Sequence, residues 1–323
     1  MKKDVRYTII IPVFNEEAVV EETHRRLTSV MKMTGEPYEL LFVNDGSRDR
    51  TAEIVQVLVA ADQSVRFLDF SRNFGHQIAI TAGMDYARGD AIVIIDADLQ
   101  DPPEVIPQMI AKWKEGYEVV YAKRSHRKGE TWFKKRTASL FYRTLSALTE
   151  VDIPLDTGDF RLIDRNVCDA MRGIREKNRF VRGLVSWVGF RTTAVEYVRD
   201  ERFAGETKYP LKKMLRFALD GITSFSYKPL KLATYLGLAI SFASLVYLAV
   251  FLIQNLFAAT TVVAWAPFMA GLLLLNGVTL IILGILGEYI GRIYDETKNR
   301  PLYILRNRDQ LENVNYDHEV KPS

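Results

Sequence analysis

The sequence predicts an α/β protein with a Rossmann-like, mostly parallel sheet, followed by an amphipathic segment and two transmembrane helices. Short apolar segments alternate with helix-length segments up to about residue 122, which is typical of a parallel sheet with helices on both faces. From Leu232 to about Ile290 the chain is almost free of charged residues. The hydrophobic content of 48% therefore averages over a part in water and a part in a bilayer.

The expected elements of the sheet follow in order from β-branched, apolar runs that end at turn residues. Strands are expected at Tyr7–Ile11, Tyr38–Val43, Val65–Phe70, Ala91–Ile95 and Glu118–Ala122. Helices are expected at Glu16–Met33, from the turn after Asn44 to about Ala61, at Gln77–Ala87 and after Pro102-Pro103, where proline is tolerated in the first turn.

Polar residues follow three of these strands at the point where each strand ends. They are Asn15-Glu16, Asp45-Gly46-Ser47 and Asp96-Ala97-Asp98. In open parallel sheets, ligands bind outside the carboxyl ends of the strands. The sequence therefore predicts one ligand site at that edge of the sheet.

Two segments are long enough for the roughly 20 apolar residues that span a bilayer, Leu232 to about Phe257 and Ala266 to about Ile290. Lysines precede the first and basic residues follow the second, so both ends are expected in the cytoplasm of a multi-pass inner-membrane protein. A buried helical hairpin is the alternative. Glycines within the spans favour close helix packing and a homo-oligomer. The expected regions are 1–200 (catalytic, cytoplasmic), 201–230 (juxtamembrane), 231–291 (two membrane helices) and 292–323 (cytoplasmic tail).

Basic residues concentrate in two segments, 123–136 and 208–231. The first is expected to meet a diphosphate and the second anionic lipid headgroups, although a solvated charged face explains either. Lys208–Tyr227 has the pattern of an amphipathic helix, which lies in the membrane interface or faces a core. A net charge of +3 without a concentrated basic face argues against binding of nucleic acid. The single cysteine, Cys168, excludes an internal disulfide and a multi-cysteine zinc site.

Asp96 and Asp98 lie two residues apart after an apolar strand. Oxygen ligands of this kind hold Mg²⁺ or Mn²⁺, which also takes oxygens from a substrate phosphate. Such a cation neutralises the charge that develops on a departing diphosphate. Dinucleotide, phosphate-loop and helical zinc motifs do not occur in the sequence, which disfavours dehydrogenases, kinases and metalloproteases.

Five motifs together carry a resemblance to a known family. They are Ile11–Glu16 (IPVFNE), Val43–Ser47 (VNDGS), Ser71–Gly75 (SRNFG), Asp96–Glu104 (DADLQDPPE) and Thr157–Arg161 (TGDFR). In this order they resemble the family 2 glycosyltransferases of GT-A type, and among them the polyprenyl-phosphate glycosyltransferases related to dolichol-phosphate mannose synthase and bactoprenol glucosyltransferase. The resemblance extends from about Tyr7 to Tyr303.

The resemblance implies a role for each matching position. The nucleotide is expected at Pro12, Asn15, Glu16, Asp45, Arg72 and Asp96, and the divalent metal at Asp98, Gln100 and Asp96. Diphosphate or lipid phosphate is expected at Lys123, Arg124, Arg161, Arg202 and Lys208. Asp159 occupies the place of the catalytic carboxylate, and Asp156 is a rival for it.

The expected role of Asp159 is orientation of a substrate more than proton abstraction. A phosphate acceptor is already mostly dianionic at neutral pH, because its second pKa is near ~6. A structural ion pair with Arg161 or Arg165 is the alternative for this carboxylate. His76, next to the Ser71–Gly75 loop, is expected to cap a helix in preference to contacting the nucleotide.

The expected reaction is inverting transfer of a hexose, glucose from UDP-glucose first, to undecaprenyl or another polyprenyl phosphate. UDP-N-acetylglucosamine and GDP-mannose are alternative donors. A processive polysaccharide synthase is disfavoured, because two spans are too few for a channel. A catalytically silent membrane-tethered nucleotide-sugar binder is disfavoured by the presence of Asp96, Asp98 and Asp159.

Overall fold

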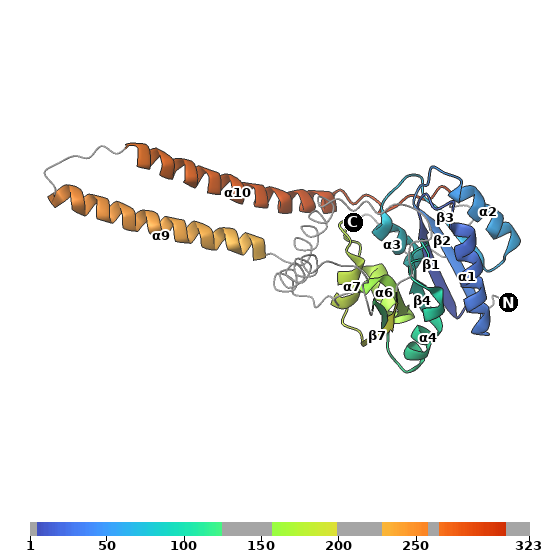
Figure 1. The fold of residues 1–323 in the computed structure, drawn as a ribbon. Helices are drawn as coiled ribbons and strands as arrows, with labels where there is room; N and C mark the ends of the chain where they lie inside the picture. The colour runs from blue at the N-terminus through green and yellow to red at the C-terminus, as the bar shows by residue number, and fades with distance from the viewer. Residues whose placement is uncertain (1–4, 125–156, 199–227, 258–264, 308–323) are drawn as a thin grey trace, which may run out of the picture.

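The computed structural model describes residues 5–124, 157–198, 228–257 and 265–307 of the chain. Of the expected site residues, Asp156, Arg202 and Lys208 lie outside these ranges, as does the amphipathic segment 208–227. The described residues form an α/β domain from which a pair of long helices projects (Figure 1).

The domain is built on a seven-stranded sheet of order β3-β2-β1-β4-β6-β5-β7. The strands are β1 (Tyr7–Val13), β2 (Tyr38–Asn44), β3 (Val65–Asp69), β4 (Ala91–Ile94), β5 (Val119–Arg124), β6 (Thr157–Asp164) and β7 (Thr192–Tyr197). The pairs among β1 to β4 are parallel, as is β5 with β7, whereas β6 runs antiparallel to both β4 and β5. The α/β class with a mostly parallel sheet is thus confirmed, and β6 and β7 are additions to the predicted strands.

Helices cover both faces of the sheet, as the apolar strands require. One buried cluster joins α1 (Val20–Met33), α2 (Thr51–Ala61) and α4 (Ile106–Lys114) to one face. The other joins α3 (His76–Tyr86), α6 (Arg165–Gly173) and α7 (Val181–Trp187) to the opposite face. A single 3₁₀ turn, η1 (Pro103–Val105), leads into α4, with proline in its first position as expected.

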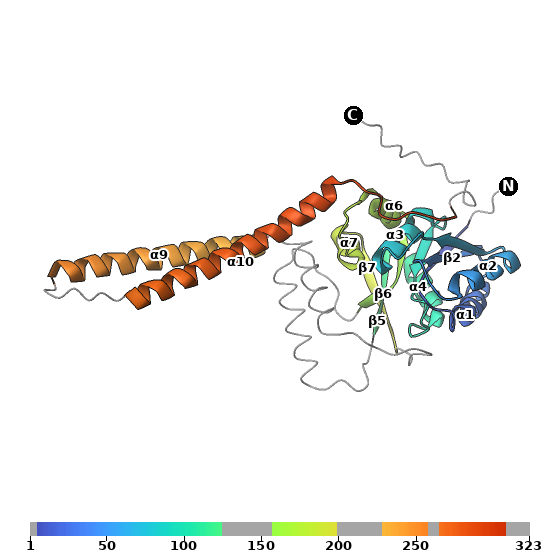
Figure 2. The ribbon, with the colours of Figure 1, turned by 90° about the horizontal axis from the view of Figure 1, so that it is seen from above.

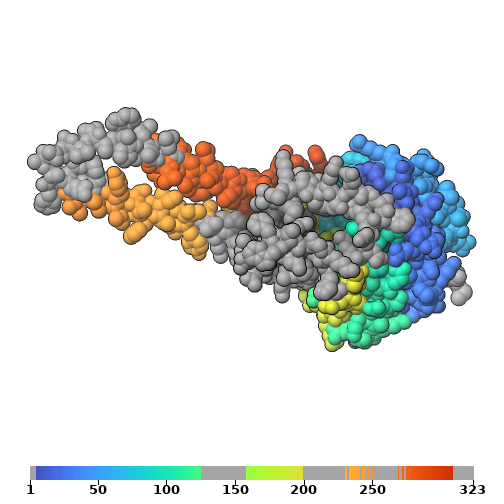
Figure 3. Space-filling view, viewed as in Figure 1, coloured from blue at the N-terminus to red at the C-terminus, as the bar shows by residue number. Residues whose placement is uncertain are grey.

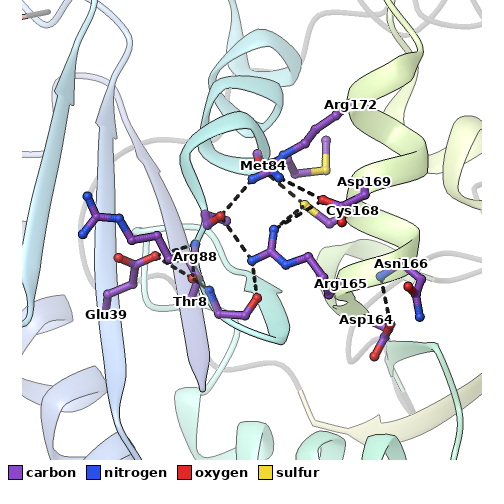
Figure 4. Close-up of polar contacts among 12 residues, drawn as sticks. Thr8, Glu39, Met84, Arg88, Asp164, Arg165, Asn166, Cys168, Asp169 and Arg172 are labelled. Atoms are coloured by element: carbon purple, nitrogen blue, oxygen red, sulfur yellow. Dashed lines mark hydrogen bonds and ion pairs between the residues drawn. The ribbon is translucent and has the colours of Figure 1, made fainter. Parts of the chain in front are cut away.

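The amino edge of the parallel strands carries a polar network that is shown in Figure 4. Arg172 donates to the carbonyls of Met84 and Ala87 at 2.8 Å each, at the carboxyl end of α3. Arg165 donates to the same Ala87 carbonyl at 3.1 Å. Guanidinium groups satisfy backbone carbonyls that a helix end leaves without partners. The network ties α6 to α3 at this edge.

The helices α9 (Lys228–Phe257) and α10 (Trp265–Thr297) lie side by side and extend away from the domain (Figures 1, 2 and 3). Among the described residues, one stretch, Leu274–Thr297, has the length and apolar composition for a membrane crossing, and none of its apolar window is buried. The second span, within the 30 residues of α9, stays a prediction. Glu288 pairs with Arg292, one turn further along α10, at 3.2 Å.

After α10 the chain returns to the domain and pairs with the residues that follow strand β3. Phe70 and Leu305 form an antiparallel bridge. The ring of Tyr303 stacks on Phe70 with centroids 5.3 Å apart, and its hydroxyl donates to Asp85 at 2.9 Å. The residues after the second helix are therefore joined to the α/β domain, which the division into separate regions did not anticipate.

Candidate active site

The turn after β2 is fixed by close contact with the loop of residues 71–75. Asp45 is buried, and its carboxylate accepts hydrogen bonds from the backbone N–H groups of Phe74 at 2.6 Å and Gly75 at 3.0 Å. Gly46 has a φ of +68°, and a Cβ there would lie 2.4 Å from the backbone carbon of Arg72. Only glycine fits this approach, which explains the Asp-Gly pair at this strand end.

The turn after β1 packs against the same region through its own backbone. Asn15 has a φ of +56°, its N–H donates to Ser47 Oγ at 3.0 Å, and its side-chain oxygen accepts from the N–H of Arg48 at 2.8 Å. The N–H of Glu16 donates to Thr51 Oγ1 at 2.8 Å. The turns that follow β1 and β2 therefore form one surface at the carboxyl edge, as the strand-end pattern predicts.

Pro12 and Arg72, the remaining expected nucleotide contacts, lie at the same edge. Pro12 is buried in β1, opposite Val43. The guanidinium of Arg72 lies 4.0 Å from the ring centroid of Phe74, in the geometry of a cation–π contact. Arg72 is exposed, so its charge is available to a ligand at this surface.

The acidic turn after β4 contains a residue in a strained conformation. Leu99 has a φ of +58°, which an apolar side chain rarely adopts, and its side chain is buried. The turn lets Asp98 Oδ1 accept the N–H of Gln100 at 3.1 Å. Strain of this kind persists where the surrounding structure holds it, often at functional sites.

The fold changes the charge state of Asp96. Burial raises the pKa of Asp96 to about 6, helped by neighbouring carboxylates including Asp159 and opposed by His76. Its Oδ1 atom is buried and accepts no hydrogen bond in the described structure. Within the described ranges, no three acidic, histidine or cysteine side chains converge as a ready metal cage. Asp96 and Asp98 fit a cation that takes its other ligands from a substrate and water, as Mg²⁺ commonly does.

Asp159 reaches the site because β6 runs antiparallel to its neighbours. Its position near the amino end of β6 brings it to the carboxyl edge of β4, where Arg161 lies opposite Ile94. The carboxylate is 5% exposed and is held by Arg182, with Nε at 2.8 Å and Nη2 at 3.1 Å. His76 Nε2 lies 3.2 Å from its Oδ2 atom.

These cations determine the charge state of the carboxylate. Burial alone would raise the pKa of Asp159, but the hydrogen bond from His76 and the charge of Arg182 hold it well below its usual range. A bidentate pair with arginine is the strongest common arrangement for a carboxylate. Asp159 is therefore an anion across the physiological pH range and a poor proton acceptor.

Arg161 lies fully buried behind Asp159 on the same strand. It donates to the backbone carbonyls of Gly158 at 2.8 Å and Asp159 at 3.1 Å, and its Nη2 atom is 3.5 Å from the Asp159 carboxylate. These contacts assign Arg161 to holding Asp159. Its expected contact with a substrate phosphate stays a prediction. The alternative ion pair of Asp159 with Arg161 is present, whereas Arg165 lies in the network at the other edge.

Lys123 and Arg124, the other expected phosphate contacts, end strand β5 at this edge. Lys123 is exposed and pairs with Glu196 at 3.4 Å. Arg124 is largely buried. Its Nε donates to the hydroxyl of Tyr197 at 3.2 Å, and its Nη2 lies 3.7 Å from Asp101. Tyr197 also donates to Asp101. The cluster connects the acidic turn to β5 and β7.

Sequence reasoning missed two groups that touch Asp159. His76 was expected to cap a helix, and this was wrong: the N-cap of α3 is Gly75, and no side chain caps the helix. Arg182 belongs to the seven-residue helix α7, which was not predicted. His76 directly follows the Ser71–Gly75 motif, and this position was the one indication in the sequence that it belongs to the site. Arg182 had no such signal.

The carboxyl edge of the sheet thus carries an acidic turn, a clamped carboxylate and the basic side chains of Arg72, Lys123 and Arg124, where an α/β sheet of this kind binds its ligands. Comparison with known proteins then identifies the family. Residues 8–172 match the model of glycosyl transferase family 2, and residues 228–293 match that of the GtrB C-terminal hairpin. The chain belongs to glycosyl transferase family 2 and is an enzyme of the glycosyltransferase class.

Three relatives align over nearly the whole chain. The uncharacterized glycosyltransferase YkcC of Bacillus subtilis is 62% identical over 97% of this chain and 97% of its own. The uncharacterized glycosyltransferase sll0501 of Synechocystis is 46% identical over 93% and 95%. The bactoprenol glucosyl transferase of Shigella phage SfV is 42% identical over 95% of this chain and its full length.

Proposed function

We propose that this glycosyltransferase transfers a hexose, glucose from UDP-glucose in the first instance, to a polyprenyl phosphate such as undecaprenyl phosphate at the cytoplasmic face of the inner membrane. The names of relatives that are 41% to 43% identical, bactoprenol glucosyl transferases, support this acceptor and this sugar. The match of residues 228–293 to a family hairpin and the apolar stretch Leu274–Thr297 support attachment to the membrane.

The observation that carries the proposal is the ion-paired state of Asp159. A hydroxyl acceptor would need a base to remove its proton, but Arg182 and His76 keep this carboxylate ionised and engaged. A phosphate monoester needs no base, because it is mostly dianionic at pH 7. A poor base at this position is thus suited to an acceptor that needs no deprotonation.

The residues of the acidic turn fit a divalent cation, Mg²⁺ or Mn²⁺. Asp98 and Asp96, with Gln100 beside them, would supply oxygen ligands; Asp96 Oδ1 accepts no hydrogen bond in the described structure, and His76 Nε2 lies 3.5 Å from it. When bound, the cation neutralises charge on the departing diphosphate. Arg72 at the nucleotide side and Lys123 at the end of β5 add positive charge at the same edge.

The proposed transfer is a single displacement. A phosphate oxygen of the lipid forms a bond to the anomeric carbon of the sugar, and the bond from that carbon to the diphosphate oxygen breaks. The electron pair leaves with the nucleoside diphosphate, and no proton moves. Attack opposite the leaving group inverts configuration, so an α-linked donor gives a β-linked lipid product.

A direct assay tests the proposal. Membranes containing the protein are incubated with undecaprenyl phosphate and a panel of radiolabelled nucleotide sugars, and label is measured in the organic extract. We expect transfer from UDP-glucose above UDP-N-acetylglucosamine and GDP-mannose. Label in polymer would instead show a processive synthase, binding without transfer a silent binder, and an α-linked product would refute single displacement.

Acceptor binding is tested at a basic residue outside the described ranges. We expect Lys208→Ala to raise the KM for polyprenyl phosphate about tenfold and to leave donor binding unchanged, because one lost charge contact to a phosphate is worth about 1.4 kcal/mol or more. Lys112→Ala is a matched control, since Lys112 is an exposed lysine on α4 whose ion pair, among the described residues, is with nearby Glu115. Weaker donor binding in the Lys208 variant would contradict the placement of the acceptor.

A further inference from the structure

His76 occupies the gap between two carboxylates of the site. Its Nε2 atom lies 3.2 Å from Asp159 Oδ2 and 3.5 Å from Asp96 Oδ1. Asp96 follows β4 and belongs to the acidic turn, whereas Asp159 belongs to β6. One ring nitrogen therefore contacts both the part of the site assigned to the donor and the part assigned to the acceptor.

The position of His76 has no structural explanation in the helix that carries it. It is the first residue of α3, the cap is Gly75, and no side chain caps the helix. Its side chain is 42% exposed, so it is not a core residue. The clusters that pack α3 against the sheet begin further along the helix, at Ile78 and Ala79.

We propose that His76 is a positioning residue that holds the Asp159 carboxylate at a fixed place relative to Asp96, and so aligns the acceptor phosphate with the sugar of the donor. The proposal rests on the proposed function for the identity of the two substrates. The contact of His76 with both carboxylates does not depend on it.

The geometry explains why Arg182 does not fill this role alone. Arg182 approaches both oxygens of Asp159 from α7 and fixes the plane of the carboxylate. His76 approaches Oδ2 from α3 and is the described side chain that also meets Asp96. With His76 removed, two carboxylates face each other without a group between them, and their repulsion separates them.

The test compares His76→Ala and His76→Gln in the full-length protein with UDP-glucose and undecaprenyl phosphate. A displacement of about 1 Å in a reacting group costs roughly 10²-fold in rate. We expect His76→Ala to lower kcat by about that factor with the KM for the donor within about twofold of wild type. We expect His76→Gln, whose amide places a donor near the same point, to recover most of the loss.

A second histidine–aspartate pair provides the matched control. His24 on α1 contacts Asp62, the C-cap residue of α2, at 3.0 Å, and neither residue is assigned to the site. We expect His24→Gln to leave kcat unchanged. The proposal is overturned if His76→Ala keeps more than half of kcat, if its loss is confined to the KM of the donor, or if His76→Gln is as slow as His76→Ala.

An independent readout separates this proposal from the proposed function. In protein with ¹⁵N-labelled histidine, we expect the Nε2 resonance of His76 to shift on Asp159→Asn and again on addition of UDP with Mg²⁺, whether or not polyprenyl phosphate is the acceptor. A resonance that neither change moves overturns the positioning role. Absence of lipid labelling by wild type overturns only the proposed function.

Discussion

The pH dependence of turnover shows whether Asp159 acts as a base. Arg182 and His76 hold the pKa of Asp159 well below its usual range, which is near ~3.9. An acceptor phosphate takes up its second proton near ~6. Since Asp159 stays ionised throughout pH 5 to 8, we expect kcat/KM to fall as the pH drops through ~6, where the acceptor is protonated and where Asp159 does not titrate.

The sign of the stability effect agrees with this expectation. A carboxylate with a depressed pKa in the folded state stabilises the protein above its unfolded pKa. That contribution is lost only as the pH falls through the still lower folded value. Loss of activity near pH ~6 is therefore not unfolding caused by Asp159.

The assay measures kcat/KM between pH 5 and 8.5 for undecaprenyl phosphate and for the corresponding phosphonate, whose second pKa is higher. We expect the acidic limb to move upward with the phosphonate. An acidic limb at the same pH for both acceptors would refute the view that the acceptor supplies its own charge.

Three further results are expected. Asp98→Ala should lower metal-dependent turnover by about 10³-fold, the equivalent of several kcal/mol, with little change in thermal unfolding; undiminished turnover would remove the metal assignment. Tyr303→Ala should lower the free energy of unfolding by about 2–4 kcal/mol, because the stack on Phe70 is lost. The exposed control Met33→Ala should change it by less than about 0.5 kcal/mol. Equal effects of the two substitutions would contradict the packing of the residues after α10 against the α/β domain. Burial raises the pKa of Cys168 to about 11, so its thiol should react with an alkylating reagent at pH 8 only after denaturation; rapid labelling of the folded protein would show that it is exposed.

The local pattern of the chain was enough to predict its class and the edge at which the site lies. Apolar strands that end in Asn15, Asp45 and Asp96 specify a parallel sheet with polar turns at one edge. Each of these features depends on residues a few positions apart. For that reason they are visible in one sequence.

The place of the antiparallel strand β6 in the sheet could not be predicted from local pattern. Its motif, Thr157–Arg161, was recognised, but the motif does not indicate that the strand pairs with β4 on one side and β5 on the other. That pairing brings Asp159 to the carboxyl edge beside Asp96. A strand's partners are selected by packing over the whole sheet, which short-range pattern does not encode.

The amino-acid sequence by itself determined which side chains are available to the site: carboxylates at strand ends, basic residues in β5, and long apolar segments for a membrane. The tertiary structure decided how they are used. It clamps Asp159 with His76, 83 positions away along the chain, and with Arg182, 23 positions away, and it brings Arg306 to Asp69 over 237 positions. Contacts at such separations arise when the sheet and its helices pack, and only then does a carboxylate acquire the charge and the orientation that its chemistry requires.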